Sequence, residues 1–160
     1  MNNSNYEKYV VRKPVLAEKG VQWGLPELGI VDLKFFLRYG GPLKEADTMI
    51  EYSWVVKDGA FGVTEDKPPH KHACNEIFWF LGTNPDDPGD LGAEVEFWMG
   101  EGKDTEVIKL NTSGVIFTPG GTLHLPVFFK KVKRPVLWTV LGLNIGETLK
   151  QTQKYPVRGI

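Results

Sequence analysis

Short segments with strand character, separated by turns rich in glycine and proline, recur along most of this chain. The segments with alternating or continuous apolar residues are 29–38, 49–56, 76–81, 93–99, 105–110, 114–118 and 135–143. The 18 Gly and 11 Pro fall largely between them, and no segment carries the apolar stripe of a strong amphipathic helix. Only 144–153 has weak helical character. The pattern predicts an all-β protein, built as a sandwich or a barrel.

The chain has 160 residues and a single composition throughout, which predicts one domain. We expect an N-terminal arm over 1–28, a β-barrel domain over 29–146 and a C-terminal tail over 147–160. A domain of this size can bury a core without disulfide support. The single cysteine excludes both an internal disulfide framework and a cysteine-rich structural zinc site.

Charge and hydropathy restrict the expected partners. The 19 basic and 20 acidic side chains nearly balance, whereas a nucleic-acid-binding surface needs a basic excess, so no nucleic-acid partner is expected. No apolar run reaches the length of a membrane span, and the polar N-terminus does not resemble a secretory signal. The sequence therefore predicts a cytoplasmic protein that does not bind membranes.

The histidines are the most informative polar residues. There are three in the chain, His70, His72 and His124. On a strand, the i and i+2 spacing of the first two places both imidazoles on one face, and Cys74 and Glu76 share that parity. Imidazole and carboxylate groups together suit a divalent first-row metal such as Fe, Mn, Zn, Ni or Co. Three or four protein ligands would leave open positions, as in catalytic rather than structural sites.

These residues lie in two segments that resemble the paired motifs of the cupin superfamily. The first segment has Gly62, His70, Lys71, His72, three residues, Glu76, five residues and Gly82. The second has Gly114, four residues, Pro119, Gly120, Gly121, two residues, His124, three residues and Phe128. The leading glycine is more distant than in the family pattern, the final gap of the first motif is one residue short, and Phe128 replaces an asparagine. The resemblance implies a double-stranded β-helix, or jelly-roll barrel, with a metal bound by His70, His72, Glu76 and His124.

Some residues near the motifs have two interpretations. Glu76 could be the carboxylate ligand, or it could act beside the metal as a general base, and we name it as the candidate catalytic residue. Cys74 fits a small buried apolar residue better than a ligand. Aromatic side chains are expected to line a largely apolar substrate pocket. The pocket candidates are Tyr52, Trp54, Phe78, Phe117, Phe128 and Trp138.

The resemblance is specific for fold and metal but not for reaction. The first hypothesis is an oxygenase, isomerase or lyase that acts on a small organic molecule with a carbonyl, carboxylate or enolic oxygen. The alternative is a non-catalytic cupin that binds or senses a small molecule. A homodimer is expected, and the loop over 82–92 could be either a lid or a peripheral feature.

Overall fold

The computed structural model describes residues 6–13, 15–16, 29, 34–37, 43, 46–65, 68–145 and 153–154. These residues form an all-β structure with two 3-10 turns and no α-helix. The 3-10 turns are η1 (Glu7–Tyr9) and η3 (Gly102–Asp104). The strands are β1 (Val15–Leu16), β2 (Lys34–Leu37), β3 (Thr48–Val55), β4 (Gly59–Phe61), β5 (His70–Lys71), β6 (Asn75–Leu81), β7 (Asp90–Met99), β8 (Glu106–Thr112), β9 (Gly114–Thr118), β10 (His124–Lys130), β11 (Val136–Leu143) and β12 (Gln153–Lys154).

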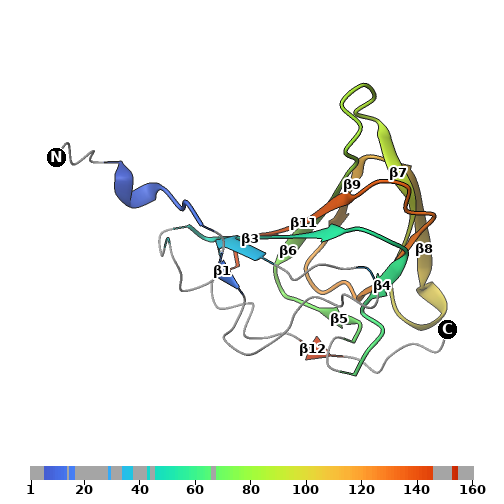
Figure 1. Ribbon diagram of the computed structural model, residues 1–160. Helices are drawn as coiled ribbons and strands as arrows, with labels where there is room; N and C mark the ends of the chain where they lie inside the picture. Colours follow the sequence, from blue (N-terminus) through green and yellow to red (C-terminus); the bar gives the residue numbers. More distant parts are fainter. Residues whose placement is uncertain are drawn as a thin grey trace.

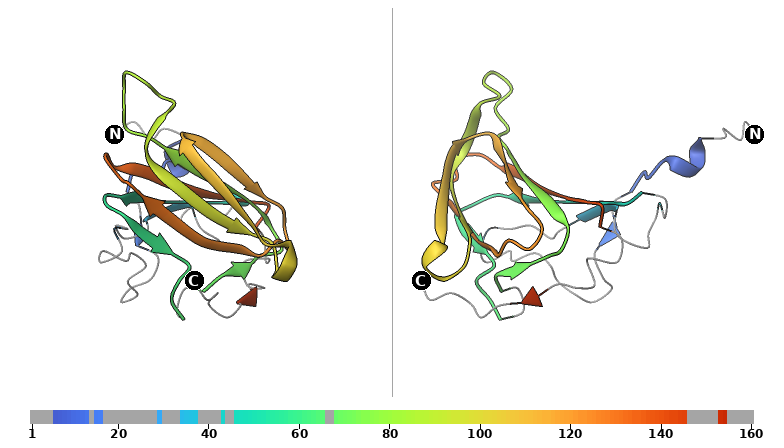
Figure 2. Two further views of the ribbon diagram at one scale, coloured as in Figure 1. Left: turned by 90° about the vertical axis from the view of Figure 1, so that its right-hand side faces the viewer. Right: turned by 180° about the vertical axis from the view of Figure 1, so that it is seen from behind.

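The strands form two antiparallel sheets that face each other and enclose a barrel-like interior (Figure 1, Figure 2). The first sheet has the order β1-β2-β3-β11-β6-β9, and the second has the order β12-β5-β10-β7-β8, with β4 paired to β10. The segment around η1 projects away from the barrel (Figure 1). In the part of the chain that the structure describes, no helix is long and apolar enough to cross a membrane.

Alternating side chains build the core between the sheets. Along β6 the inward residues are Glu76, Phe78 and Phe80, while Trp79 points outward and is exposed. Along β7 the inward residues include Val95 and Phe97. Because successive side chains of a strand face opposite sides of its sheet, each sheet contributes one apolar face to the core. The largest fully buried side chains include Trp138, Phe80, Phe97, Phe129 and Leu91.

The predicted all-β architecture is confirmed, with strands in every segment that the sequence indicates. Two strands of the central region, β4 and β10, were not predicted. β10 contains Pro126, which cannot donate to a ladder and which sequence patterns assign to edges or turns. The strand accommodates it through a register shift between His124 and Val127. Within the predicted arm the structure describes 6–13 and 15–16, which include η1 and β1, and within the predicted tail it describes β12; the rest of both segments, and most of 144–153, lie outside the described residues.

The prediction that Tyr52 and Trp54 line an interior pocket is wrong. It requires the face of 49–56 that carries Ile50, Tyr52, Trp54 and Val56 to point inward. In β3 the buried positions are instead Met49, Ser53 and Val55, and Trp54 is exposed. The more apolar side of this strand therefore lies on the outer surface of the first sheet, which also carries the exposed Trp79 and Phe117 of the neighbouring strands.

Candidate metal centre

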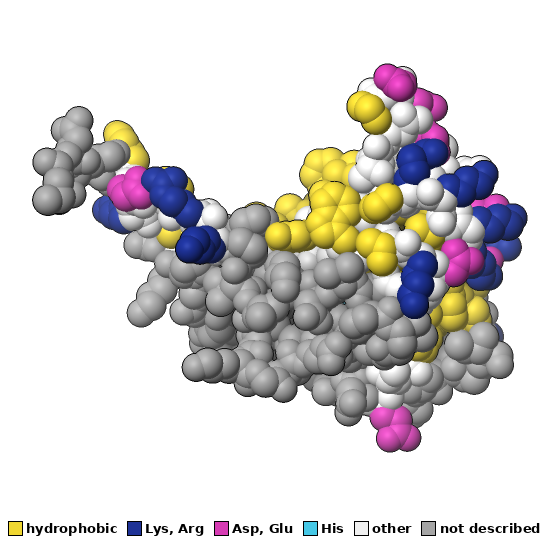
Figure 3. Space-filling view, viewed as in Figure 1, with side chains coloured by type: hydrophobic (Ala, Val, Ile, Leu, Met, Phe, Trp, Pro, Cys, Tyr) yellow, Lys and Arg dark blue, Asp and Glu magenta, His cyan; other side chains and the backbone are white. Residues whose placement is uncertain are grey.

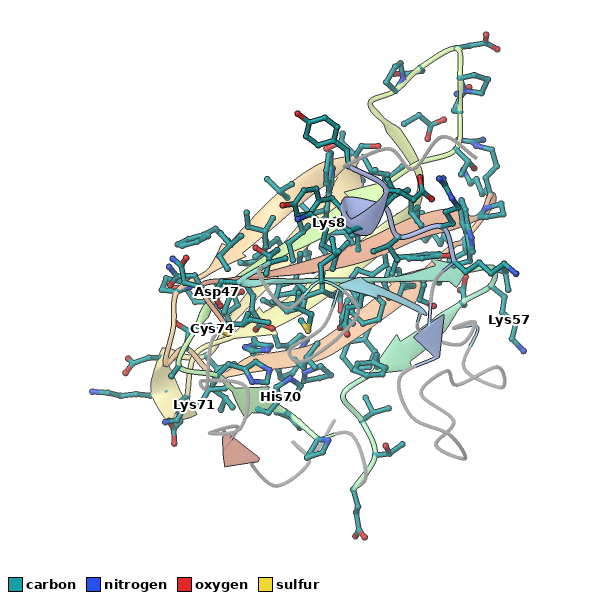
Figure 4. All side chains as sticks on the ribbon, turned by 90° about the vertical axis from the view of Figure 1, so that its left-hand side faces the viewer. Lys8, Asp47, Lys57, His70, Lys71 and Cys74 are labelled. Atoms are coloured by element: carbon teal, nitrogen blue, oxygen red, sulfur yellow. The ribbon has the colours of Figure 1, made fainter. Side chains whose placement is uncertain are left out.

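The three histidines meet at one end of the barrel interior. His70 begins β5 and lies directly opposite His124, the first residue of β10, while His72 follows β5 by one residue. The ring centroid of His70 lies 4.8 Å from that of His72 and 4.7 Å from that of His124. One potential ligand atom from each ring lies within 4.8 Å of the other two. Two distant sequence segments thus form one cluster that could hold a metal ion (Figure 4).

The turn that precedes His124 is attached to the segment that follows His72. The Gly121 N–H donates to the His72 carbonyl at 2.7 Å, and the Gly120 N–H donates to Asn75 Oδ1 at 2.9 Å. A Cβ atom at Gly120 would lie 2.2 Å from the Ala73 carbonyl oxygen, so only glycine fits this close approach. Gly121 adopts a φ of +84°, which also favours glycine. The Pro-Gly-Gly sequence therefore fixes the position of His124 relative to His72.

Backbone carbonyl groups orient two of the imidazoles. His70 Nδ1 lies 2.9 Å from the Pro68 carbonyl oxygen, and His124 Nδ1 lies 3.0 Å from the Thr122 carbonyl oxygen. A carbonyl oxygen only accepts hydrogen bonds, so in each neutral ring the proton is on Nδ1. The lone pair is then on Nε2, which is the arrangement of a metal-binding imidazole whose other nitrogen is held by the protein.

Glu76 brings a carboxylate to the same point from the opposite sheet. Its Oε2 lies 3.2 Å from His124 Nε2, and its Oε1 lies 3.6 Å from His72 Nε2. Both Glu76 Oε2 and His124 Nε2 are buried and have no hydrogen-bond partner among the described residues. When the carboxyl is ionised, two electron-rich atoms face each other in an environment where an unpaired polar atom is costly.

The environment disfavours the charged form of each of these groups when nothing else is bound. Burial raises the pKa of Glu76 to about 8, and the Glu51 carboxylate adds to the shift. Burial lowers the pKa of His72 to about 4, and the neighbouring His70 contributes. Burial, together with His70 and His72, holds the pKa of His124 well below its ordinary value, although its bond to Thr122 acts in the opposite direction. Neutral imidazoles at neutral pH are the form that binds metals.

A divalent cation fits this set of donors. Metal bonds to histidine nitrogen and carboxylate oxygen of about 2.0–2.2 Å place neighbouring ligand atoms roughly 3.0–3.5 Å apart. The separations of 3.2 and 3.6 Å from Glu76 to the two histidines are close to that range. A cation between them would also satisfy the unpartnered Glu76 Oε2 and His124 Nε2. The residues present therefore match the chemistry of a metal site.

Two residues that the sequence did not single out lie beside this cluster. The Phe97 ring stacks parallel to His124, with centroids 6.5 Å apart and an interplanar angle of 8°. Thr118 pairs directly with Glu76 across β9 and β6, is buried, and its hydroxyl has no hydrogen-bond partner within the described residues. The alternation of 93–99 signals that Phe97 points inward, whereas only the pairing of β6 with β9 brings Thr118 to Glu76.

The structure separates the residues predicted to line the pocket. Phe78 lies at the cluster, with its ring centroid 5.3 Å from that of His124. Trp138 is buried elsewhere in the interior against Phe61 and Phe129. The others occupy outward positions of their strands. These are Tyr52, Trp54 and Phe117 on the first sheet and Phe128 on the second.

Cys74 and the loop after β6 occupy different places relative to the cluster. Cys74 is buried and belongs to the hydrophobic core, in agreement with its interpretation as a small apolar residue, and it lies at the same end of the barrel as His70 (Figure 4). The loop between β6 and β7 protrudes at the end of the barrel opposite β5 (Figure 1, Figure 2). Asp90 at its end forms an ion pair with Arg134. From this position the loop does not cover the histidines.

Comparisons with known proteins identify the fold. No protein-family model matches the sequence, and no curated protein matches it. Among solved structures, the DMSP lyase DddQ from Ruegeria pomeroyi DSS-3 superposes with a TM-score of 0.53 at 18% identity, covering 92% of this chain and 63% of that chain. An oxalate oxidase gives a TM-score of 0.52 at 13% identity, covering 89% and 62%. A vicilin from Solanum melongena gives 0.51 at 15% identity, covering 80% and 30%.

These likenesses establish the fold alone. The chain has the double-stranded β-helix fold of the cupins, as its two motifs indicate. It spans less than two thirds of the length of each of the three proteins. They include two enzymes and a vicilin, so the shared fold does not select an activity.

Proposed function

We propose that this chain is a metal-dependent cupin enzyme in which His70, His72, His124 and Glu76 hold one divalent transition metal. The observation that carries this proposal is the buried contact between Glu76 Oε2 and His124 Nε2, 3.2 Å apart and without hydrogen-bond partners in the described structure. Such a pair is costly in an empty interior and favourable around a cation. The backbone bonds that turn the Nε2 lone pairs of His70 and His124 away from the strands provide independent support.

The chain's own residues would divide the work at this site. The three imidazoles and the carboxylate hold the metal, which when bound supplies a Lewis acid for a substrate oxygen. Phe78 and Phe97 pack against His124 and exclude water from that side of the cluster. Burial raises the pKa of Glu76 to about 8 in the metal-free protein, so this carboxyl holds a proton near neutral pH that binding of the metal would release.

The substrate class follows from the donor set. A metal with three neutral ligands and one carboxylate retains positive charge, which attracts a small molecule with a carboxylate, carbonyl or enolic oxygen. The structural neighbours named as an oxalate oxidase and a DMSP lyase suggest small carboxylates for a first screen. Oxygenase, isomerase and lyase chemistry are all compatible with this arrangement.

The first experiment is metal analysis of protein purified without added metal, followed by a screen of small carboxylates under air and without oxygen. The proposal predicts about one divalent metal per chain and turnover that a chelator abolishes. His72→Ala should remove metal and activity together. Lys71→Ala, between the two histidines, is the matched control and should retain both.

Other outcomes would change the proposal. Stoichiometric metal together with saturable ligand binding, but no turnover in either atmosphere, would favour the non-catalytic binding cupin. Absence of metal from the purified protein, with no uptake of Fe²⁺, Mn²⁺, Zn²⁺, Ni²⁺ or Co²⁺ by the refolded chain, would overturn the metal site itself.

A further inference from the structure

A buried threonine lies directly beside Glu76 on the inner face of the first sheet. Thr118, the last residue of β9, pairs with Glu76 of β6, and the two residues are 1% and 3% exposed. Directly paired residues of an antiparallel ladder have Cβ atoms about 4.5–5.5 Å apart on the same face of the sheet. The Thr118 hydroxyl is therefore the polar side-chain group that β9 places beside the Glu76 carboxyl.

This hydroxyl has no evident use in the protein without a bound metal. The other inward positions of β9 are Gly114 and Ile116, so the polar group is confined to the end of the strand. Neither Thr118 Oγ1 nor Glu76 Oε2 has a hydrogen-bond partner among the described residues. A buried hydroxyl without a partner is unfavourable. Its presence here points to a partner that becomes available in another state of the site.

The turn that follows β9 fixes where this hydroxyl lies. The Gly120 N–H donates to Asn75 Oδ1 at 2.9 Å, and Asn75 immediately precedes Glu76 in β6. Because threonine is branched at Cβ, its side chain has few rotamers available. The backbone at Thr118 is thus attached to the backbone at Glu76 both by the strand pairing and by this turn, and its hydroxyl can reach only nearby groups.

The Glu76 carboxylate has acceptor positions to spare. An ionised carboxylate offers two oxygens with about four lone-pair positions. Its Oε2 faces His124 at 3.2 Å and its Oε1 faces His72 at 3.6 Å. Metal binding on that side would leave the remaining lone pairs open to a donor. Hydrogen bonds to a ligating carboxylate fix its orientation, and removal of such a supporting group weakens metal binding by about 10–100-fold.

We propose that Thr118 is a positioning residue of the metal centre: its hydroxyl donates a hydrogen bond to the Glu76 carboxylate in the metal-bound protein and holds it toward His72 and His124. This inference rests on the proposed function, because it assigns Thr118 a role at that same site. Thr118 acts through Glu76 and is not itself a ligand. The same hydroxyl is therefore unfavourable in the metal-free protein and contributes to affinity in the metal-bound protein.

The test is Co²⁺ titration of the metal-free full-length chain, followed by the visible absorption of the bound ion. Thr118→Val keeps the shape of the side chain and removes the hydroxyl, and it should weaken Co²⁺ binding about tenfold. Thr118→Ser restores the hydroxyl and should recover most of the lost affinity. A Thr118→Ser variant that binds as weakly as Thr118→Val would overturn the inference, because the methyl group and not the hydroxyl would then matter.

Thr139→Val is the matched control. Thr139 occupies an outward position of β11, in the sheet over whose outer surface hydrophobic side chains gather (Figure 3). The same exchange of a hydroxyl for a methyl group should leave Co²⁺ affinity unchanged there. Urea unfolding of the metal-free proteins is the second readout, and Thr118→Val should unfold at the same urea concentration as the wild type or at a higher one. A purely structural role would lower this concentration together with the affinity, and would overturn the inference.

A double-mutant cycle with Glu76→Ala shows whether the hydroxyl acts through the carboxylate. In the Glu76→Ala background, Thr118→Val should cause no further loss of Co²⁺ affinity. An equal loss in both backgrounds would overturn the inference, since Thr118 would then act on the metal directly or through another ligand.

The outcomes separate this inference from the proposed function. A wild type that binds Co²⁺ stoichiometrically, with a Thr118→Val variant that binds it equally well, would overturn the role of Thr118 and leave the metal centre in place. A wild type that takes up none of the divalent metals named above would overturn the metal centre and the role of Thr118 together.

Discussion

The same strands build the two ends of the barrel interior, and the two ends differ in what their buried side chains require. Along β6 the inward residues change from Glu76 to Phe80, and along β10 from His124 to Phe129. Phe80 and Phe129 pack against each other with ring centroids 6.1 Å apart. We call this the packed end, and the region of Glu76 and His124 the polar end. Contacts between aromatic rings fill the packed end, whereas the polar end holds a buried carboxyl and a buried imidazole without hydrogen-bond partners in the described structure.

The largest expected effect is at the packed end. Phe129→Ala should lower the free energy of unfolding by about 3–5 kcal/mol, because it removes a fully buried ring and leaves a cavity. Urea unfolding followed by tryptophan fluorescence measures the change. Phe129→Leu should cost much less and should bind metal as the wild type does. A loss below about 1 kcal/mol for Phe129→Ala would show that this end does not hold the fold.

At the polar end the expected stabilisation comes from the metal. Metal at 100 times its dissociation constant should raise the free energy of unfolding by about 2.7 kcal/mol. His72→Ala should abolish this increase while the metal-free variant stays folded, and Lys71→Ala should retain it. Unfolding with and without metal measures both. An equal metal-induced increase in His72→Ala would contradict the assignment of this histidine as a ligand.

The pH dependence of the metal-free protein distinguishes the two ends further. Burial raises the pKa of Glu76 from its ordinary value of 4.5 to about 8. Between these two pH values the folded protein keeps a proton on Glu76, whereas the unfolded chain has released it. Stability therefore falls as pH rises toward 8, by at most about 1.4 kcal/mol per pH unit. The lowered pKa of His72, about 4, and the lowered pKa of His124 act in the opposite direction, chiefly below pH 6.5. From pH 6.5 to 8 the contribution of Glu76 is the larger.

In that window the free energy of unfolding should fall in the metal-free wild type and stay level in Glu76→Gln, because glutamine does not titrate. Thermal unfolding of both proteins at several pH values provides the measurement. Parallel curves for the two proteins would show that Glu76 is not the group responsible.

The smallest expected change in the free energy of unfolding comes from removing one buried hydroxyl, and adding a hydroxyl elsewhere in the core is the matched comparison. Thr118→Val at the polar end removes a buried hydroxyl with no hydrogen-bond partner in the described structure, and should raise the free energy of unfolding of the metal-free protein by up to about 1 kcal/mol. Val95→Thr, fully buried in the core, should lower it by about 1–3 kcal/mol. Equal destabilisation by both changes would indicate that Thr118 already has a partner.

The polar end was more predictable from sequence than the outer surfaces. Histidine is rare in this chain: the spacing of His70 and His72 predicts that these two lie together, and the resemblance to the two motifs adds His124 to the cluster that could hold a metal. The all-β class follows from alternation and turn residues. The predictions that failed concern which side of a strand faces the barrel interior, because that depends on the sheet that the strand joins.

Trp54 and Phe117 illustrate that failure. Both stand on strands with apolar residues on either side, and sequence alone assigns the more apolar side to the core. The outer surface of the first sheet is also apolar, so that rule selected the wrong side of β3. Thr118 was missed for a related reason, because its importance comes only from its pairing with Glu76 on a neighbouring strand.

The most direct test of the central claim is X-ray absorption spectroscopy of the metal-loaded wild-type protein and of His72→Ala. Multiple scattering from imidazole rings reports how many histidines bind the metal. The structure predicts three imidazoles in the wild type and a smaller number, or no bound metal, in the variant. A metal without imidazole ligands, or identical spectra from the two proteins, would contradict a centre built from His70, His72 and His124.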